Sequence, residues 1–280
     1  MSADSEPVRR VGFIGLGRQG APMARRILAA FPLTIWARRP ATVESFGTDG
    51  VDIADSPAAL GAACDFVGLC VTGDADFVET MCGRGLIDAM RPGAVAAIHG
   101  TISPDTCVAI TRYAAARGVH VLDAPVSGGA PAAREGTLAV MVGGDSGAFV
   151  RARPVLETFG STVRHVGPAG QGQICKLVNN VLLMANIRLA QAALALGAGF
   201  GMDRHGLYEL LMASSGASAA MRAFQEQVTP EVAPHMAALG TKDLALLLAA
   251  AGNAGLDAAP LDAMARQALD MLRAGTGTER

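Results

Sequence analysis

Short apolar runs alternate with amphipathic stretches along the first 166 residues of the chain. Each run has the length of a buried strand. The predicted strands are residues 11–14, 33–36, 66–71, 94–98, 119–122 and 138–142. Helical patterns lie between them, for example at residues 21–30 and 105–117. This alternation predicts an α/β fold with a parallel sheet that helices cover on both faces.

The pattern changes near residues 167–170, where two glycines and a proline cluster. After this point the strand signals end. Long apolar helical stretches follow at residues 174–197, 203–213, 244–251 and 261–273. We therefore predict an α/β domain over residues 1–168 and an all-α domain over residues 169–280.

Two segments bear on membranes and secretion. The apolar stretch 182–200 contains Asn186, Arg188 and Gln191, so we interpret it as a buried helix and not as a membrane span. The first ten residues are polar and lack the apolar core of a signal peptide.

The five cysteines form no CxxC pair, which favours a reducing, cytoplasmic location and indicates no metal site. The formal net charge of −2 gives no basic surface for nucleic acid.

A glycine-rich loop follows the first predicted strand and opens a helix. It fits the pattern GxGxxG and reads Gly15, Leu16, Gly17, Arg18, Gln19, Gly20. In a Rossmann domain the first glycine permits the tight turn, the second lets the backbone approach a pyrophosphate, and the third lets the helix pack on the strand. The loop therefore predicts a dinucleotide cofactor, and the alternative is a glycine-rich turn in a chain with 34 glycines.

The end of the second predicted strand indicates which dinucleotide binds. An acid usually stands there in NAD enzymes, where it holds the ribose hydroxyls. This chain instead has Arg38 and Arg39, whose guanidiniums suit a 2′-phosphate. NADP is therefore the predicted cofactor, and NAD stays possible if one arginine stacks on the adenine and the other is solvated.

Lysine is rare in this chain. Of the 23 basic residues only Lys176 and Lys242 are lysines. Arginine is always charged, whereas lysine loses a proton more readily in a dry site. The two lysines are therefore candidates for chemistry, although a bias in base composition could also leave two by accident.

Two further clusters accompany these lysines. Residues 123–129 end in Ser127, Gly128 and Gly129, where a hydroxyl and free N–H groups could hold a carboxylate, unless this is an ordinary turn. Residues 170–180 place Lys176, Asn179 and Asn180 at i, i+3 and i+4, on one face of a helix. Such polar groups need partners, and the alternative is a polar stripe at a domain contact.

With these motifs in order, the sequence resembles the β-hydroxyacid dehydrogenases, which include 3-hydroxyisobutyrate dehydrogenase and tartronate semialdehyde reductase. The resemblance runs from Val11 to about Pro260 and covers residues 12–20, 123–129, 170–180 and 242–244. It implies a long interdomain helix and an all-helical second domain used for substrate binding and dimerisation, hence a homodimer or homotetramer. It also implies hydride transfer between NAD(P) and a small β-hydroxyacid or semialdehyde that bears a carboxylate.

The resemblance also assigns roles to single residues. Lys176 matches the catalytic general acid and base, and Asn180 matches an asparagine that helps to hold the substrate. The remaining matches are Asn179, Ser127, Gly128 and Gly129 toward the substrate, and Val71, Thr72, Thr101 and Lys242 toward the cofactor. His99 and Gly100 depart from the family's pattern before residues 101–104, which leaves the substrate open. The alternatives are an imine reductase-like enzyme, a branch that replaces the catalytic lysine, and a non-catalytic NADP-binding protein.

Overall fold

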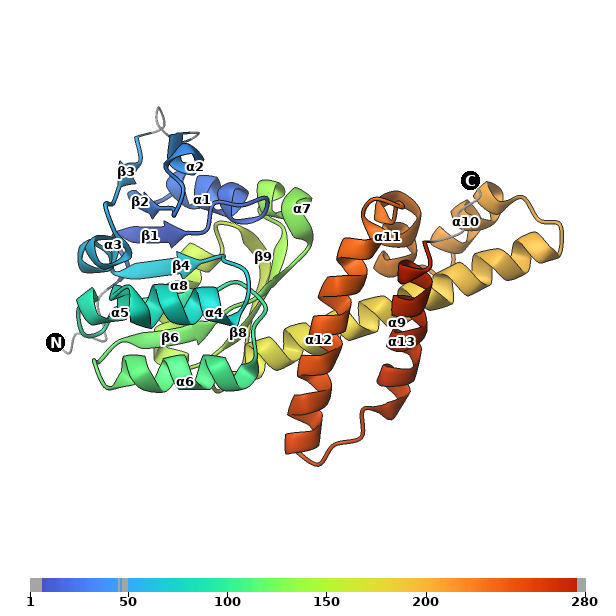
Figure 1. Cartoon of the computed structure of the whole chain (residues 1–280). Helices are drawn as coiled ribbons and strands as arrows, with labels where there is room; N and C mark the ends of the chain where they lie inside the picture. Colours follow the sequence, from blue (N-terminus) through green and yellow to red (C-terminus); the bar gives the residue numbers. More distant parts are fainter. Residues whose placement is uncertain (1–6, 45, 47–49, 276–280) are drawn as a thin grey trace. The chain divides into compact units, whose positions relative to one another are not determined.

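The computed structural model describes residues 7–44, 46 and 50–275. The chain divides into two compact units, Met1–Lys176 and Leu177–Arg280. The first is a sheet covered by helices, and the second is all-helical (Figure 1). The predicted fold class is confirmed, while the predicted boundary at residue 168 stays a prediction.

The sheet of the first unit has nine strands in the order β3-β2-β1-β4-β5-β6-β8-β7, with β9 paired to β8. The strands are β1 (Val11–Ile14), β2 (Leu33–Trp36), β3 (Asp52–Ile53), β4 (Phe66–Leu69), β5 (Val95–Ile98), β6 (His120–Asp123), β7 (Val126–Ser127), β8 (Leu138–Gly143) and β9 (Gly160–Gly167). The order reverses between β1 and β4, and open α/β sheets bind ligands at such a switch point, outside the carboxyl ends of the strands.

The sheet is mostly parallel, as the sequence predicts, with one antiparallel part that the sequence analysis did not foresee. In the sheet order, the strands β3, β2, β1, β4, β5 and β6 are all parallel to their neighbours. Strand β8 runs antiparallel to both β6 and β7. Only the short helix α7 lies between β7 and β8, and a short connection is enough for antiparallel neighbours. Strands β3, β7 and β9 were not predicted because the first two have two residues each and β9 is largely exposed.

Helices cover both faces of this sheet. They are α1 (Gly20–Leu28), α2 (Pro40–Glu44), α3 (Pro57–Ala63), α4 (Asp74–Val78), the π-helix η2 (Glu79–Gly83), α5 (Leu86–Ala89), α6 (Pro104–Ala115), α7 (Gly129–Glu135) and α8 (Ser146–Leu156). Apolar residues of α1, α7 and α8 form one core with one face of the strands. Those of α3, α4, η2, α5 and α6 form a second core with the other face. Burial on both faces explains why β1, β4 and β5 are continuous apolar runs.

The helical unit contains most of α9 (Gln171–Gly199), together with α10 (Arg204–Met212), α11 (Ala219–Gln227), α12 (Ala233–Asn253) and α13 (Ala259–Arg273). Its core joins Leu177 and Met184 of α9 to Leu244 of α12 and Leu269 of α13. A Cβ on Gly240 would lie 2.8 Å from Leu269 Cδ2 and 3.2 Å from Met184 Sδ, so the three helices pack closely at this glycine. Helix α12 is much longer than the predicted residues 244–251, since it begins at Ala233 and continues through Gly240.

Helix α9 is long and apolar enough to cross a membrane by length and composition, and 39% of its most apolar window is buried. It is the one such helix among the described residues. A core helix of a soluble protein meets the same two criteria, so the finding is weak evidence for a membrane span.

Candidate active site

The glycine loop joins β1 to α1 at the switch point of the sheet. Gly15 has a φ of +94°, and a Cβ there would lie 2.3 Å from the carbonyl oxygen of Cys70. A Cβ on Gly20 would lie 1.8 Å from the carbonyl oxygen of Gly15, so α1 packs against the loop itself. A Cβ on Gly17 would meet nothing within 4 Å, which leaves open space beside the backbone. No side chain caps the N-terminus of α1, and its first turn carries no acid. This cradle therefore fits a dinucleotide pyrophosphate.

The other members of the loop lie as follows. Leu16 is buried in the core, Gln19 is half-buried at the N-cap of α1, and Arg18 is exposed. Arg18 thus adds an exposed positive charge beside the cradle.

The two arginines after β2 differ in their surroundings. Arg38 donates from Nη1 and Nη2 to the two carboxylate oxygens of Asp76, at 2.9 and 3.2 Å. Arg39 is exposed next to it in the sequence. Asp76 lies in α4 and reaches back to the end of β2, and sequence reasoning missed it.

The loops after β4 and β5 lie against one another. A Cβ on Gly100 would lie 2.7 Å from the carbonyl oxygen of Val71. Val71 and Thr101 are half-buried, while Thr72 is exposed. The structure therefore brings together the two loops predicted to line the nicotinamide side.

The first turn of α9 is fixed by a buried carboxylate. Asp123, at the end of β6, accepts hydrogen bonds from Gly170 N at 2.9 Å and from Gln173 N at 2.8 Å. Burial raises the pKa of the Asp123 carboxyl, and the two N–H donors oppose this effect. Asp123 is the first residue of the second sequence cluster, but its role here is to cap a helix.

A buried amide makes the second connection. Gln173 is fully buried, and its Oε1 accepts a hydrogen bond from Ile102 N at 3.1 Å. Its Nε2 donates to the carbonyl oxygen of Gly100 at 2.9 Å. Because Gln173 precedes Lys176 by one helical turn, these bonds tie the helix that carries Lys176 to the loop that carries Thr101. Sequence reasoning missed Gln173, although a glutamine inside an apolar helix was a usable signal.

The polar face of α9 continues one turn beyond Lys176. Asn179 Nδ2 donates to Asn180 Oδ1 at 3.1 Å, and Asn180 Nδ2 donates to Asp243 Oδ2 at 2.7 Å. Asp243 is 5% exposed, and its Oδ1 lies 2.9 Å from Lys242 Nζ. The second lysine of the chain is therefore linked through Asp243 to Asn180. Lys176 itself is half-buried.

The loop of the second cluster follows β7. Ser127 ends this strand and is half-buried. Gly128 and Gly129 have φ values of +127° and +68°, and a Cβ on Gly128 would lie 2.6 Å from Ala132 Cβ. Only glycine allows this backbone path, which exposes main-chain groups beside the Ser127 hydroxyl.

Other groups offer less chemistry. His99 is buried with Nδ1 2.9 Å from the carbonyl oxygen of Ala124, and burial lowers the pKa of His99 to about 4. It stacks on Phe13 as a neutral core residue. Among the residues that the structure describes, no group of three or more His, Cys, Asp or Glu is placed to hold a metal ion.

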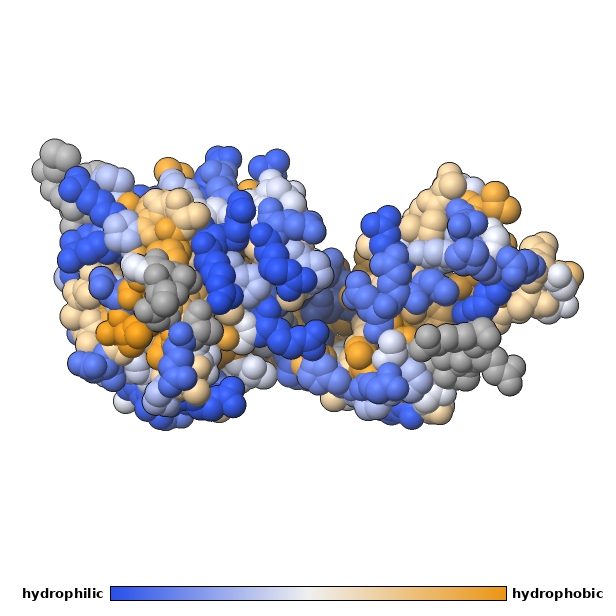
Figure 2. All heavy atoms as spheres, turned by 90° about the horizontal axis from the view of Figure 1, so that it is seen from above, coloured by the Kyte–Doolittle hydropathy of each residue, from blue (hydrophilic) through white to orange (hydrophobic). Residues whose placement is uncertain are grey.

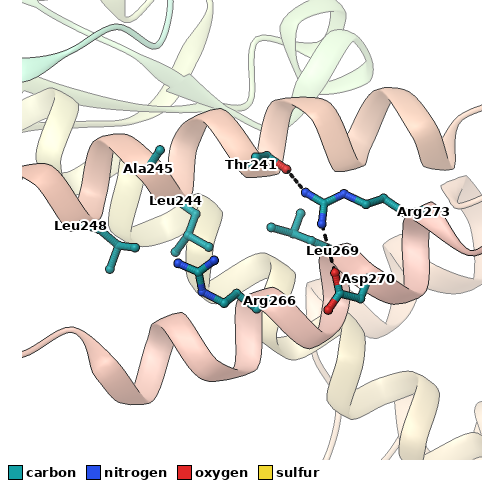
Figure 3. A pocket seen from close by; sticks show the side chains of 8 residues that line it. All are labelled: Thr241, Leu244, Ala245, Leu248, Arg266, Leu269, Asp270 and Arg273. Carbon is teal, nitrogen blue, oxygen red and sulfur yellow. Dashed lines mark hydrogen bonds and ion pairs between the residues drawn. The ribbon is translucent and has the colours of Figure 1, made fainter.

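A pocket opens between α12 and α13 of the helical unit (Figure 3). It is lined by Thr241, Leu244, Ala245, Leu248, Arg266, Leu269, Asp270 and Arg273. Arg273 spans its rim, donating to Thr241 Oγ1 at 2.7 Å and to Asp270 Oδ1 at 3.0 Å. None of the predicted site residues lines this pocket.

Comparison with known proteins decides the family. Residues 10–167 match the NAD binding domain of 6-phosphogluconate dehydrogenase, and residues 170–280 match the NAD-binding domain of NADP-dependent 3-hydroxyisobutyrate dehydrogenase. The 2-(hydroxymethyl)glutarate dehydrogenase of Eubacterium barkeri is 35% identical over 278 residues, which cover 96% of this chain and 91% of that protein. The chain belongs to the β-hydroxyacid dehydrogenase family.

Other β-hydroxyacid dehydrogenases agree with this assignment. The 3-hydroxyisobutyrate dehydrogenase of Pseudomonas aeruginosa is 35% identical over 270 residues, covering 91% of this chain and 89% of that protein. The structure of the Mycobacterium tuberculosis 3-hydroxyisobutyrate dehydrogenase with L-serine superposes with a TM-score of 0.81 at 28% identity, over 95% of this chain and 93% of that one. The predicted family and the predicted activity class, an NAD(P)-dependent hydroxyacid dehydrogenase, are thereby confirmed. An imine reductase from Streptomyces aurantiacus, at 19% identity and a TM-score of 0.65, shares the fold alone.

Proposed function

We propose that the chain transfers a hydride between NADP and the hydroxyl-bearing carbon of a small β-hydroxyacid, with Lys176 as general acid and base. The observation that carries this proposal is the anchoring of α9. Asp123 and Gln173 fix its first turn to the ends of β6 and β5, so that Lys176 stands on a rigid support. When bound, the nicotinamide accepts or supplies the hydride.

The side chains of this protein handle the proton and the charge. In the oxidation the Lys176 amine takes the proton of the substrate hydroxyl, and in the reduction the ammonium returns it to the carbonyl oxygen. Its charge also stabilises a developing alkoxide. Asn180, one turn along the same helix, orients the substrate, and Asn179 holds the Asn180 amide oxygen.

We assign Lys242 to the cofactor side of this arrangement, where it also neutralises the buried Asp243. This assignment rests on the family resemblance at residues 242–244, and the Lys242–Asp243–Asn180 connection links the lysine to the polar face of α9. It fails if a Lys242→Ala enzyme keeps full turnover.

The substrate carboxylate is proposed to bind at Ser127, Gly128 and Gly129. Both glycines have positive φ angles and are exposed, so their main-chain N–H groups are candidate donors, and the Ser127 hydroxyl adds another. The dehydrogenases related to this chain suggest a panel to test: 3-hydroxyisobutyrate, L-serine and 2-(hydroxymethyl)glutarate.

Cofactor preference gives a direct test of the arginines after β2. Wild-type protein is expected to bind NADPH more tightly than NADH, and changing Arg38 and Arg39 together to glutamine should weaken NADPH far more than NADH, since only NADPH carries the 2′-phosphate. Fluorescence titration of the nicotinamide measures both dissociation constants. Wild-type protein that binds NADH better would disprove the NADP preference.

A second copy of this chain is the proposed partner, in a homodimer or homotetramer. Figure 2 shows exposed apolar side chains, in orange, on the surface of the helical unit. Five exposed apolar residues follow α9 and its end: Val178, Leu182, Leu189, Leu196 and Phe200. At about 100° per residue they fall within about 40° of one another around the helix axis, and Lys176 points to the opposite side. An exposed apolar face of this kind is typical of a protein–protein contact. A contact on this face would leave the polar face with Lys176 available to substrate.

Charging this stripe should break the assembly. Leu189→Asp together with Leu196→Asp is expected to give a monomer of 28.5 kDa in light scattering after size exclusion, while wild type elutes at twice that mass or more. Leu256→Asp, at an exposed position outside α9, is the control and should assemble like wild type. A monomeric wild-type protein would refute the proposal. Separating a whole-cell lysate into cytoplasmic and membrane fractions tests the proposed cytoplasmic location, and recovery of the protein in the membrane fraction would contradict it.

A further inference from the structure

Asp76 holds the arginine that the proposed function gives to the 2′-phosphate of NADP. Arg38 follows β2 and Asp76 lies in α4 after β4, and these two strands flank β1. Both terminal nitrogens of Arg38 are engaged by the two oxygens of Asp76, at 2.9 and 3.2 Å. The side chains of Arg38 and Asp76 are 59% and 26% exposed, so the pair stands at the surface with its acid the more enclosed partner.

We propose that Asp76 is a specificity-determining residue that competes with the 2′-phosphate for Arg38 and so limits the preference for NADP over NAD. The proposal rests on the proposed function, in which Arg38 and Arg39 face the adenosine ribose. Two features of the pair support it.

The first is occupancy. The two terminal nitrogens of a guanidinium can bind one carboxylate or one phosphate in a bidentate manner. In Arg38 both nitrogens already donate to Asp76. A phosphate must therefore displace Asp76 or accept hydrogen bonds from fewer N–H groups of Arg38.

The second is charge. A phosphate monoester carries nearly two negative charges, and a carboxylate offers acceptors only, so the two repel when both approach one guanidinium. The 2′-hydroxyl of NAD is neutral and can donate to a carboxylate. Asp76 therefore supplies, from α4, the acid that is missing at the end of β2.

The neighbouring acids have other partners. Asp74, in the same helix turn, accepts a hydrogen bond from Ser103 N at 3.0 Å. Glu79, in η2, pairs with Arg84 at 2.7 Å. Of these three acids only Asp76 is directed to Arg38.

Asp76→Asn tests the proposal because it keeps the shape of the side chain and removes its charge. Dissociation constants for NADPH and NADH are measured by fluorescence titration of the full chain. The Asn variant is expected to bind NADPH about fivefold more tightly, the scale of one partly exposed ion pair, and to bind NADH equally or less tightly. Arg38→Gln should then cost more NADPH affinity in the Asn background than in wild type.

Glu157→Gln is the matched control, since it removes an exposed carboxylate that pairs with Arg153 in α8 and changes the net charge equally. It should leave both constants unchanged. An unchanged NADPH to NADH ratio in Asp76→Asn, a shift toward NADH, or an equal shift in the Glu157→Gln control would each overturn the proposal. A wild-type protein that prefers NADH would refute the proposed NADP preference alone, because the ratio shift in Asp76→Asn is judged against whatever ratio wild type has.

Discussion

Replacing Lys176 with arginine is expected to lower kcat by about 10²–10⁴-fold, the usual worth of general acid–base catalysis, although the positive charge is kept. The guanidinium stays protonated and is bulkier, so it cannot take a proton from the substrate hydroxyl. Lys176→Ala should lose a similar factor. Because arginine supplies nearly all other positive charges in this chain, a purely electrostatic role would tolerate the change.

Two controls make this result interpretable. NADPH affinity should be nearly unchanged in both variants, because the phosphate cradle is built from β1 and α1. Lys242→Arg replaces the other lysine of the chain, in an ion pair that arginine can keep, and is expected to retain more activity than Lys176→Arg. Near-normal turnover by Lys176→Arg would show that charge alone suffices. Loss of cofactor binding in both Lys176 variants would make this lysine a structural residue.

Gln173→Leu should lower kcat by about 10²-fold, the cost of misplacing a catalytic group by roughly an ångström. Leucine fills the space but makes neither hydrogen bond, so the N–H of Ile102 and the carbonyl of Gly100 lose their partner in a buried region. The loop and the first turn of α9 would then shift relative to one another. We expect kcat to fall more than NADPH affinity, together with a lower Tm.

The control for Gln173 is Gln171, an exposed glutamine in the same helix turn, and Gln171→Leu should behave like wild type. If Gln173→Leu lowers the Tm and leaves kcat unchanged, Gln173 only stabilises the fold.

How far the sequence predicts this site depends on how local each feature is. The glycine loop consists of six consecutive residues between a strand and a helix, so its pattern can be recognised from the sequence alone. The shared face of Lys176, Asn179 and Asn180 follows from helix geometry alone. The strands in the middle of the sheet were predicted for the same reason, as continuous apolar runs.

Contacts between distant segments were not predictable. Arg38 and Asp76 are separated by 38 positions, Asp123 and the Gln173 N–H by 50, and Asn180 and Asp243 by 63. No periodicity in a single sequence encodes such pairs, since the fold itself brings them together. The short or exposed strands β3, β7 and β9 could not be predicted for a related reason. Their pairing with neighbouring strands defines them, and their own residues carry no strand pattern.

Turnover of matched acids and esters decides whether this chain oxidises small β-hydroxyacids with a nicotinamide cofactor. Purified protein is mixed with NADP or NAD and with 3-hydroxyisobutyrate, L-serine or 2-(hydroxymethyl)glutarate, and reduced nicotinamide is followed by absorbance. We expect turnover of at least one acid, with a much lower kcat/KM for its methyl ester and little activity in Lys176→Ala. No turnover of any acid with either cofactor, or equal efficiency on acid and ester, would contradict the account.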